Sequence, residues 1–255
     1  MEEGKLSLAL RIPCFMFDCR ARLRPAAFFD IAQELAALGS EQAHFSDGEI
    51  ASHGLVWILA RMSVRFDCML CRLDCVTAST WHRGFNGLFF ARDYQLLSED
   101  GEIAVSATSD WVIMDKESRR IMRRERVAGV IPFEAQCEDC AMGEPCGKVV
   151  PPPRTAFKPA GEHKVLYSDL DYNGHVNNAR YVVWALDTLP PEITFRCSVR
   201  SLEINFNHEV LPASVVALFC ARDGDTFYVE GRSSGVQNFI CRVIMCRNDS
   251  VRDSV

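Results

Sequence analysis

The pattern of apolar and polar residues passes through two different periods in the first half of the chain. Over residues 25–43 the apolar side chains recur every three or four positions, a spacing that gathers them on one face of an α-helix. Strand-like runs rich in Val, Ile, Phe and Trp follow at residues 55–67, 73–82, 87–98 and 103–115. The Asp100–Gly101 pair predicts a hairpin turn between the last two runs.

The same order returns in the second half of the chain. A strand-like segment, Lys164–Ser168, leads into a helix that we expect over residues 177–187, with Asn177 as its N-cap. Strand-like runs then follow at residues 197–206, 213–221, 226–233 and 238–246.

A segment of different composition separates the two halves. Residues 128–160 contain Gly143, Gly147 and the run Pro151–Pro153, a composition typical of an extended, semi-rigid linker. We therefore expect an N-terminal domain at residues 1–127, a linker at 128–160 and a C-terminal domain at 161–255.

The two halves align as an internal repeat. An offset of 153 places Asp18 on Asp171 and Phe28 on Tyr181, and an offset of 140 places Phe66 on Phe206. Each half reads as a strand, a helix and about four more strands, which predicts one helix packed on an antiparallel sheet. The predicted fold is thus α+β, a tandem (double) hot-dog in which each unit is an antiparallel sheet wrapped around one long helix.

Composition and charge exclude several classes of protein. The chain has 255 residues, 48% of them apolar, and a formal net charge of −6, so it is not intrinsically disordered. A mildly acidic chain lacks the basic face that a nucleic-acid binder needs, and no apolar run approaches the roughly 20 residues of a membrane span. The N-terminus shows no export signal, and we expect a cytoplasmic protein.

The twelve cysteines allow two interpretations. Cys68/Cys71 and Cys137/Cys140 form two Cys-x-x-Cys pairs, which could supply four ligands to a zinc ion. The interpretation that we favour is that these cysteines serve as small buried apolar residues in a reducing compartment.

Only the second half holds a complete set of side chains suited to acid–base chemistry. At the aligned positions the first half has Arg20, Arg22 and Met69. In the second half an acid, an amide, an imidazole and a second acid are present: Asp171, Asn173, His175 and Glu209. Such a set can perform general acid–base catalysis, and a helix N-terminus beside it offers backbone N–H groups to an oxyanion. The alternative is that these are ordinary loop and capping residues.

The run Asp169–Asn178 (DLDYNGHVNN), followed by Tyr181, Trp184 and Asp187, resembles the signature of the acyl-acyl-carrier-protein thioesterases of bacteria and plants. Shorter segments also resemble the family, namely Gln33–Glu34, Trp57–Arg61, Thr80–Trp81, Arg92–Tyr94 and Trp111. The resemblance implies two hot-dog domains, with the acyl pocket chiefly in the N-terminal one and catalysis in the C-terminal one. It also implies hydrolysis of a fatty acyl thioester on the phosphopantetheine arm of acyl carrier protein, with no metal or organic cofactor.

The resemblance also assigns roles to residues. Asp171, Asn173 and His175 fall on the family's catalytic loop, and Glu209 falls on its catalytic acid. Plant members have a cysteine after that acid, whereas this chain has Val210, so we expect water as the nucleophile. Plant members also carry a plastid transit peptide that this chain lacks, which favours a bacterial, cytoplasmic version.

Strand alternation opposes one of these assignments. Successive side chains point to opposite faces of a strand, so Ile204 and Phe206 put His208, and not Glu209, on their own face. Glu209 can share that face only if a β-bulge intervenes. His208 therefore remains a rival candidate for the general base.

A basic run and several alternatives stay open. The run contains six basic residues: Lys116, Arg119, Arg120, Arg123, Arg124 and Arg126. We favour a solvated run that protects a sheet edge, and the alternative is a docking patch for acidic acyl carrier protein. The other functions that fit are a non-catalytic acyl-binding module, an acyl-coenzyme A thioesterase and a hot-dog hydratase. Chain-length preference and oligomeric state, including a homodimer, also stay open.

Overall fold

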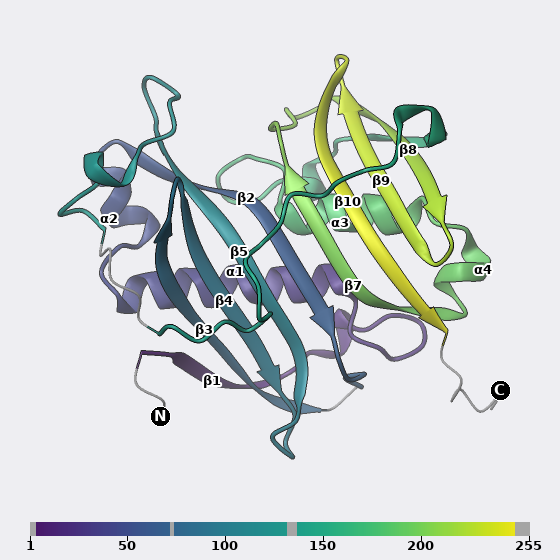
Figure 1. Cartoon of the computed structure of the whole chain (residues 1–255), viewed down its shortest axis with the longest axis horizontal. Helices are drawn as coiled ribbons and strands as arrows, with labels where there is room; N and C mark the ends of the chain where they lie inside the picture. The colour runs from purple at the N-terminus through teal and green to yellow at the C-terminus, as the bar shows by residue number, and fades with distance from the viewer. Residues whose placement is uncertain (1–3, 72–73, 132–136, 248–255) are drawn as a thin grey trace. The chain divides into compact units, whose positions relative to one another are not determined.

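The computed structural model describes residues 4–71, 74–131 and 137–247. By its internal contacts the chain divides into a first unit, Met1–Gly147, and a second unit, Lys148–Val255 (Figure 1). Each unit consists of an antiparallel sheet with one principal helix on it.

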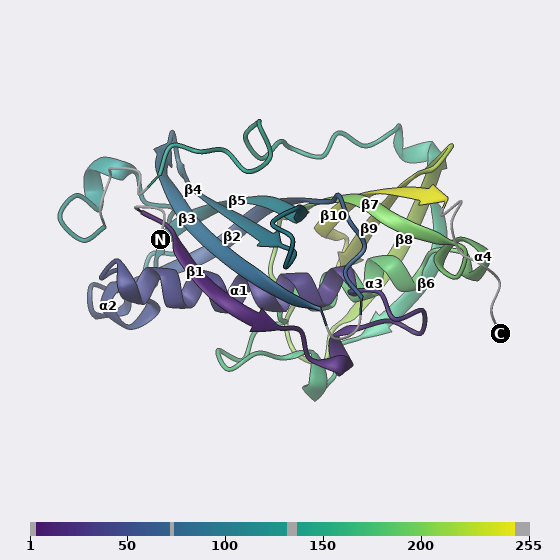
Figure 2. The ribbon, with the colours of Figure 1, turned by 90° about the horizontal axis from the view of Figure 1, so that it is seen from below.

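In the first unit, α1 (Pro25–Gln42) lies along one face of a five-stranded sheet (Figure 2). The strands pair in the order β1-β3-β4-β5-β2. Their bounds are Leu6–Arg11, Leu55–Phe66, Cys75–Asn86, Phe89–Leu97 and Ile103–Asp115 for β1 to β5. The stripe of α1 that contains Phe28, Ile31 and Leu35 is buried, because the apolar face of an amphipathic helix is stabilised by packing on a sheet.

The second unit has the same plan. Helix α3 (Asn178–Asp187) accompanies strands that pair in the order β7-β10-β9-β8-β6. Their bounds are Lys158–Lys164, Cys197–Phe206, Val215–Asp223, Thr226–Ser233 and Val236–Arg247 for β6 to β10. Val182 of α3 is fully buried, as are Leu202 and Val229 of the sheet.

Short elements account for most departures from the predicted pattern. The prediction of a strand at Lys164–Ser168 is wrong, because β6 ends at Lys164 and a 3₁₀ turn, η4 (Tyr167–Asp169), follows. The Asp169 carboxylate accepts the Leu166 N–H at 2.8 Å, and a side chain that bonds to a nearby backbone N–H competes with strand pairing. The strand expected before the first helix was predicted without bounds and is β1, whereas the short helices α2 (Asp47–Ser52) and α4 (Pro191–Thr194) were not predicted.

Residues 137–147, within the predicted linker, pack against the first unit. The indole N–H of Trp81 donates to the Asp139 carbonyl, and Lys5 pairs with the Asp139 carboxylate, both at 2.8 Å. The Ala141 N–H donates to the Asp93 carboxylate, also at 2.8 Å. This segment runs over the face of the sheet opposite α1 (Figure 2).

The described residues bear on the cysteines and on membrane insertion. All twelve cysteines are described and none forms a disulfide. The interpretation as buried residues is wrong for Cys68 and Cys71, which are exposed, and Cys137 and Cys140 are only half-buried. In residues 4–71, 74–131 and 137–247, no three His, Cys, Asp or Glu side chains gather as they would around a metal ion. Within the same ranges no helix has the length and apolarity needed to cross a bilayer.

Candidate active site

The Asp171 side chain organises the turn before α3. Its Oδ1 accepts the backbone N–H of Asn173 at 2.8 Å and that of His175 at 3.1 Å. The backbone closes the same turn, because the Asp171 N–H donates to the His175 carbonyl at 2.8 Å. Gly174 has a φ of +77°, a conformation that glycine adopts without strain. The Asp-x-Asn-Gly-His order is therefore first a turn-forming sequence.

The turn presents the His175 imidazole to Glu209. His175 Nε2 lies 3.1 Å from Glu209 Oε1, and the two side chains are 58% and 32% exposed. The pair is thus close enough to exchange a proton and open enough to meet a water molecule or a substrate.

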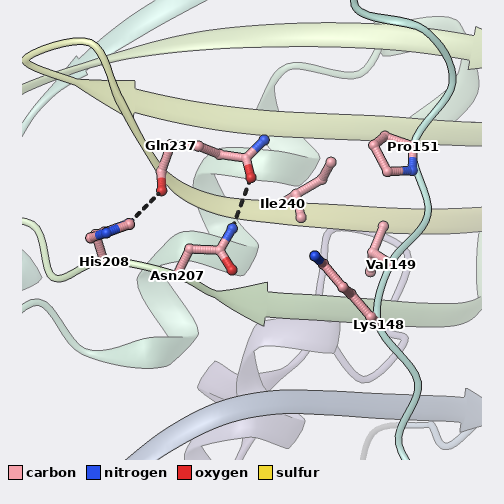
Figure 3. A pocket seen from close by; sticks show the side chains of 7 residues that line it. All are labelled: Lys148, Val149, Pro151, Asn207, His208, Gln237 and Ile240. Atoms are coloured by element: carbon pink, nitrogen blue, oxygen red, sulfur yellow. Dashed lines mark hydrogen bonds between the residues drawn. The ribbon is translucent and has the colours of Figure 1, made fainter. Parts of the chain in front are cut away.

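A bulge after β7 directs Glu209 to that position. The N–H groups of Asn207 and His208 both donate to the Asn238 carbonyl, at 2.7 and 3.0 Å, so two residues of one strand oppose a single residue of its partner. Within the bulge, His208 Nδ1 lies 3.1 Å from the Gln237 carbonyl (Figure 3). Alternation along a regular strand is therefore broken, and the carboxylate of Glu209 is the group that meets His175.

His208 and Asn207 instead line a separate pocket of about 430 Å³ in the second unit. The side chains around it belong to Lys148, Val149, Pro151, Asn207, His208, Gln237 and Ile240 (Figure 3). Asn207 Nδ2 donates to Gln237 Oε1 at 2.8 Å, so both residues of the bulge are tied to β10.

The remaining candidate, Asn173, is an exposed residue of the turn. Its backbone N–H joins it to Asp171. The structure thus brings Asp171, His175 and Glu209 together through direct contacts and holds Asn173 in the same turn.

Two backbone N–H groups at the start of α3 already donate hydrogen bonds within the fold. The Asn177 side chain accepts the Ala179 N–H at 2.8 Å, as predicted for the N-cap. The Asn177 N–H donates to the Asp169 carbonyl at 2.9 Å. The Asn177 N–H is therefore already engaged within the fold and does not remain for an oxyanion.

Sequence reasoning missed a polar pair beneath the turn. His163 Nε2 lies 2.9 Å from Asp169 Oδ2, and the His163 ring stacks on Trp184 with 4.5 Å between ring centroids. Burial alone would raise the pKa of Asp169, but hydrogen bonds from His163 and the Leu166 N–H outweigh it and lower that pKa. Asp169 begins the run that resembles the family signature, and this was the available signal.

Tyr181 of α3 connects the helix to the segment that carries Glu209. Its hydroxyl is hydrogen-bonded to the backbone of Val210, the residue after Glu209. Burial raises the pKa of Tyr181 to about 12, so the hydroxyl that reaches the Val210 backbone stays protonated at neutral pH.

The basic run lies on the surface of the first unit. All six of its basic residues are exposed, and they follow β5 up to and including the 3₁₀ turn η2 (Arg124–Arg126). The segment starts with a turn in which the Asp115 carboxylate accepts the N–H and the hydroxyl of Ser118. The charges are therefore displayed to solvent from a folded turn.

Family models match both units. Residues 6–127 match the acyl-ACP thioesterase N-terminal domain, where ACP is acyl carrier protein, and residues 155–242 match the corresponding C-terminal domain. The chain belongs to the acyl-ACP thioesterase family. The family that the sequence run resembled is thereby confirmed.

Individual acyl-ACP thioesterases show the extent of the similarity. The palmitoyl-acyl carrier protein thioesterase of Gossypium hirsutum is 33% identical over 184 residues, which cover 70% of this chain and 44% of that protein. Its Arabidopsis thaliana counterpart is 31% identical, with the same coverage of both chains. The chain thus spans less than half the length of these curated relatives.

Solved acyl-ACP thioesterase structures share the fold. The protein from Bacteroides thetaiotaomicron superposes with a TM-score of 0.86 at 21% identity, over 95% of this chain and 98% of that one. The 12:0-ACP thioesterase of Umbellularia californica gives a TM-score of 0.80 at 19% identity, over 97% and 99% of the two chains. These superpositions confirm the predicted α+β tandem hot-dog.

Proposed function

We propose that the protein hydrolyses fatty acyl thioesters carried on acyl carrier protein and releases free fatty acids. The observation that carries the proposal is the 3.1 Å contact between His175 and Glu209 beside the start of α3. Membership of the acyl-ACP thioesterase family supports the choice of substrate, as do the names of its relatives.

In the proposed reaction a water molecule attacks the thioester carbonyl carbon. Glu209, together with His175, takes the proton of the attacking water. Asn173 orients the water or the carbonyl, and Asp171 keeps His175 in place by holding the turn. The N–H groups of Val176 and Asn178, at the positive end of the α3 dipole, stabilise the oxyanion.

The tetrahedral intermediate then collapses by breaking the carbon–sulfur bond. The products are a fatty acid and the phosphopantetheine thiol, whose sulfur takes up the proton. A thiol has a pKa of about 8.5 by analogy with cysteine, so the thiolate is a good leaving group. The residues of the turn and the bulge are sufficient for this chemistry, and the proposal requires no metal or organic cofactor.

We further propose that the exposed basic run Lys116–Arg126 docks the carrier protein. Six cations on one short segment create a local positive potential on a chain whose net charge is −6, and such a patch steers an acidic partner. A cytoplasmic location also belongs to the proposal, since a reducing compartment maintains twelve cysteines without disulfides.

The first experiment measures free fatty acid released from a panel of acyl-ACP and acyl-coenzyme A thioesters. Glu209→Gln keeps the size of the side chain but removes its basic carboxylate, so turnover should fall by roughly 10²–10⁴-fold. The matched controls are His208→Asn, whose side chain is directed to Gln237, and Met69→Ala at the aligned position of the first unit. Both should retain turnover.

Each alternative function has its own outcome in this experiment. Acyl-ACP that is bound but returned intact would indicate an acyl-binding module, and a hydroxylated or dehydrated acyl chain would indicate a hydratase. Faster release from coenzyme A would identify an acyl-coenzyme A thioesterase. An inactive His208→Asn beside an active Glu209→Gln would transfer the role of base to His208.

A further inference from the structure

The bulge that directs Glu209 also occurs in the first unit. There the N–H groups of Asp67 and Cys68 both donate to the Ala104 carbonyl, at 2.9 and 3.2 Å. In the second unit the N–H groups of Asn207 and His208 converge in the same way on the Asn238 carbonyl. Backbone atoms alone therefore suffice to form the bulge.

The second unit adds a side chain to this backbone arrangement. Asn238 Nδ2 donates to the His208 carbonyl at 3.4 Å and to the Glu209 carbonyl at 3.3 Å. Asn238 is 2% exposed, and its counterpart in the first unit is Ala104, which has no side-chain donor. The extra contacts thus occur in the unit that carries the acid, and they reach the backbone of the acid itself.

We propose that Asn238 is the positioning residue for Glu209, an inference that rests on the proposed function. β7 ends at Phe206, and the three residues that follow it are exposed, so the Glu209 backbone lies beyond the regular strand pairing of β7. Asn238 holds this segment through its carbonyl and through its amide. A buried amide that bridges two successive carbonyls fixes the direction in which the Glu209 side chain leaves the backbone.

Residues that line the pocket also help to hold the bulge in place. The His208 ring and the Asn207 side chain are both tied to Gln237, the residue before Asn238 (Figure 3). Gln237 is fixed in turn, because its Nε2 donates to Glu230 Oε2 at 2.5 Å. Two adjacent residues of β10 therefore hold the bulge, and Asn238 is the one that contacts Glu209.

The test compares Asn238→Ala with Asn205→Ala. The first substitution installs the residue that the first unit has at this register. Asn205 is an equally buried amide, 3% exposed, whose Oδ1 accepts the Val149 N–H at 2.8 Å, so its loss should lower the melting temperature without moving Glu209. Asn238→Leu removes the same donors at nearly constant volume, and it serves if the alanine variant folds poorly.

We expect Asn238→Ala to lower kcat by roughly 10- to 100-fold, since a displacement of about 1 Å can cost that much. KM should change little, because the buried amide does not touch the substrate. A kcat for Asn238→Ala equal to that of Asn205→Ala would overturn the positioning role and leave Asn238 as a stabilising residue.

Crystal structures of both variants separate this inference from the proposed function. The distance from His175 Nε2 to Glu209 Oε1 should exceed 4 Å on average in Asn238→Ala, by the limit for ion-pair contact, and stay near 3.1 Å in Asn205→Ala. An unchanged distance in Asn238→Ala would refute the inference even if hydrolysis were confirmed. Conversely, a wild-type protein without hydrolase activity would refute the proposed function. The distance in the Asn238→Ala crystal structure would then still decide whether Asn238 positions Glu209.

Discussion

Residues 18–22 of the first unit and 171–175 of the second fold into the same turn. Asp18 Oδ1 accepts two backbone N–H groups at 2.8 and 3.0 Å, and Asp171 Oδ1 accepts the two aligned groups at 2.8 and 3.1 Å. The fourth residue has a positive φ in both, +56° for Ala21 and +77° for Gly174. An aspartate at this position therefore serves the fold before it serves any chemistry.

The side chains that leave the two turns differ in what they contact. In the first unit Arg22 returns to Asp18, with Nε 2.8 Å and Nη2 2.6 Å from Oδ2. In the second unit His175 points to Glu209, whereas the residue aligned with Glu209 in the first unit is the half-exposed Met69. The first turn thus ends in an ion pair within the turn, and the second leaves an imidazole and a carboxylate in contact and open to solvent.

The strongest test of this contrast substitutes the residues at the aligned positions 175 and 22. His175→Ala removes the partner of Glu209, and turnover of acyl-ACP should fall by roughly 10²-fold or more. Arg22→Ala removes the ion pair with Asp18, whose side chains are 11% and 25% exposed, and should leave turnover unchanged because the pair of His175 and Glu209 is kept. Steady-state kinetics of both variants check this expectation. Comparable losses in the two would mean that the first turn also takes part in catalysis.

A smaller effect should distinguish the two helix starts. Asn177 caps α3 through its side chain, whereas Arg24 at the start of α1 makes no capping hydrogen bond and is followed by Pro25. Asn177→Ala should cost about 1 kcal/mol, or roughly 2–4 °C in melting temperature. Arg24→Ala loses an exposed contact to the Phe15 carbonyl and should shift the melting temperature less. Calorimetry of both variants measures the two shifts in melting temperature. Equal shifts would contradict the prediction that only Asn177 caps its helix.

The smallest expected effect is on the pH dependence of stability, through Asp18 in the first unit. Burial alone would raise the pKa of Asp18, but hydrogen bonds from Arg22 and from the backbone outweigh it and lower that pKa below 3.8. The folded state then binds fewer protons than the unfolded state, so this stabilisation is present above about pH 4. It is lost as the pH falls through the lowered pKa.

Arg22→Ala should therefore move acid unfolding to higher pH, because it removes the side-chain hydrogen bond and the positive charge that help to lower the pKa of Asp18. Circular dichroism during acid titration measures the shift, with Arg20→Ala as the control because the Asp18 contact of Arg20 is made by its backbone N–H. Coincident curves for Arg22→Ala and the wild type would show that the ion pair contributes nothing.

Local patterns predicted the regular elements, and long-range contacts decided the rest. β7 has the predicted bounds, and α3 begins one residue after its predicted cap, because alternation and capping act within a few residues. The bulge depends on the Asn238 carbonyl, some thirty positions beyond Asn207. His163 and Asp169 are only six positions apart, but they meet once β6 and η4 are folded. The resemblance to the family favoured Glu209 over His208, whereas alternation within one strand favoured the opposite.

For protein design, the bulge at Ala104 makes the first unit a ready scaffold. It already has the Asp18 turn, a helix that starts after it and two N–H groups converging on one carbonyl. A designer who wanted a second acid–imidazole pair would have no backbone to rebuild. The task would reduce to choosing side chains for positions whose backbone geometry is already set.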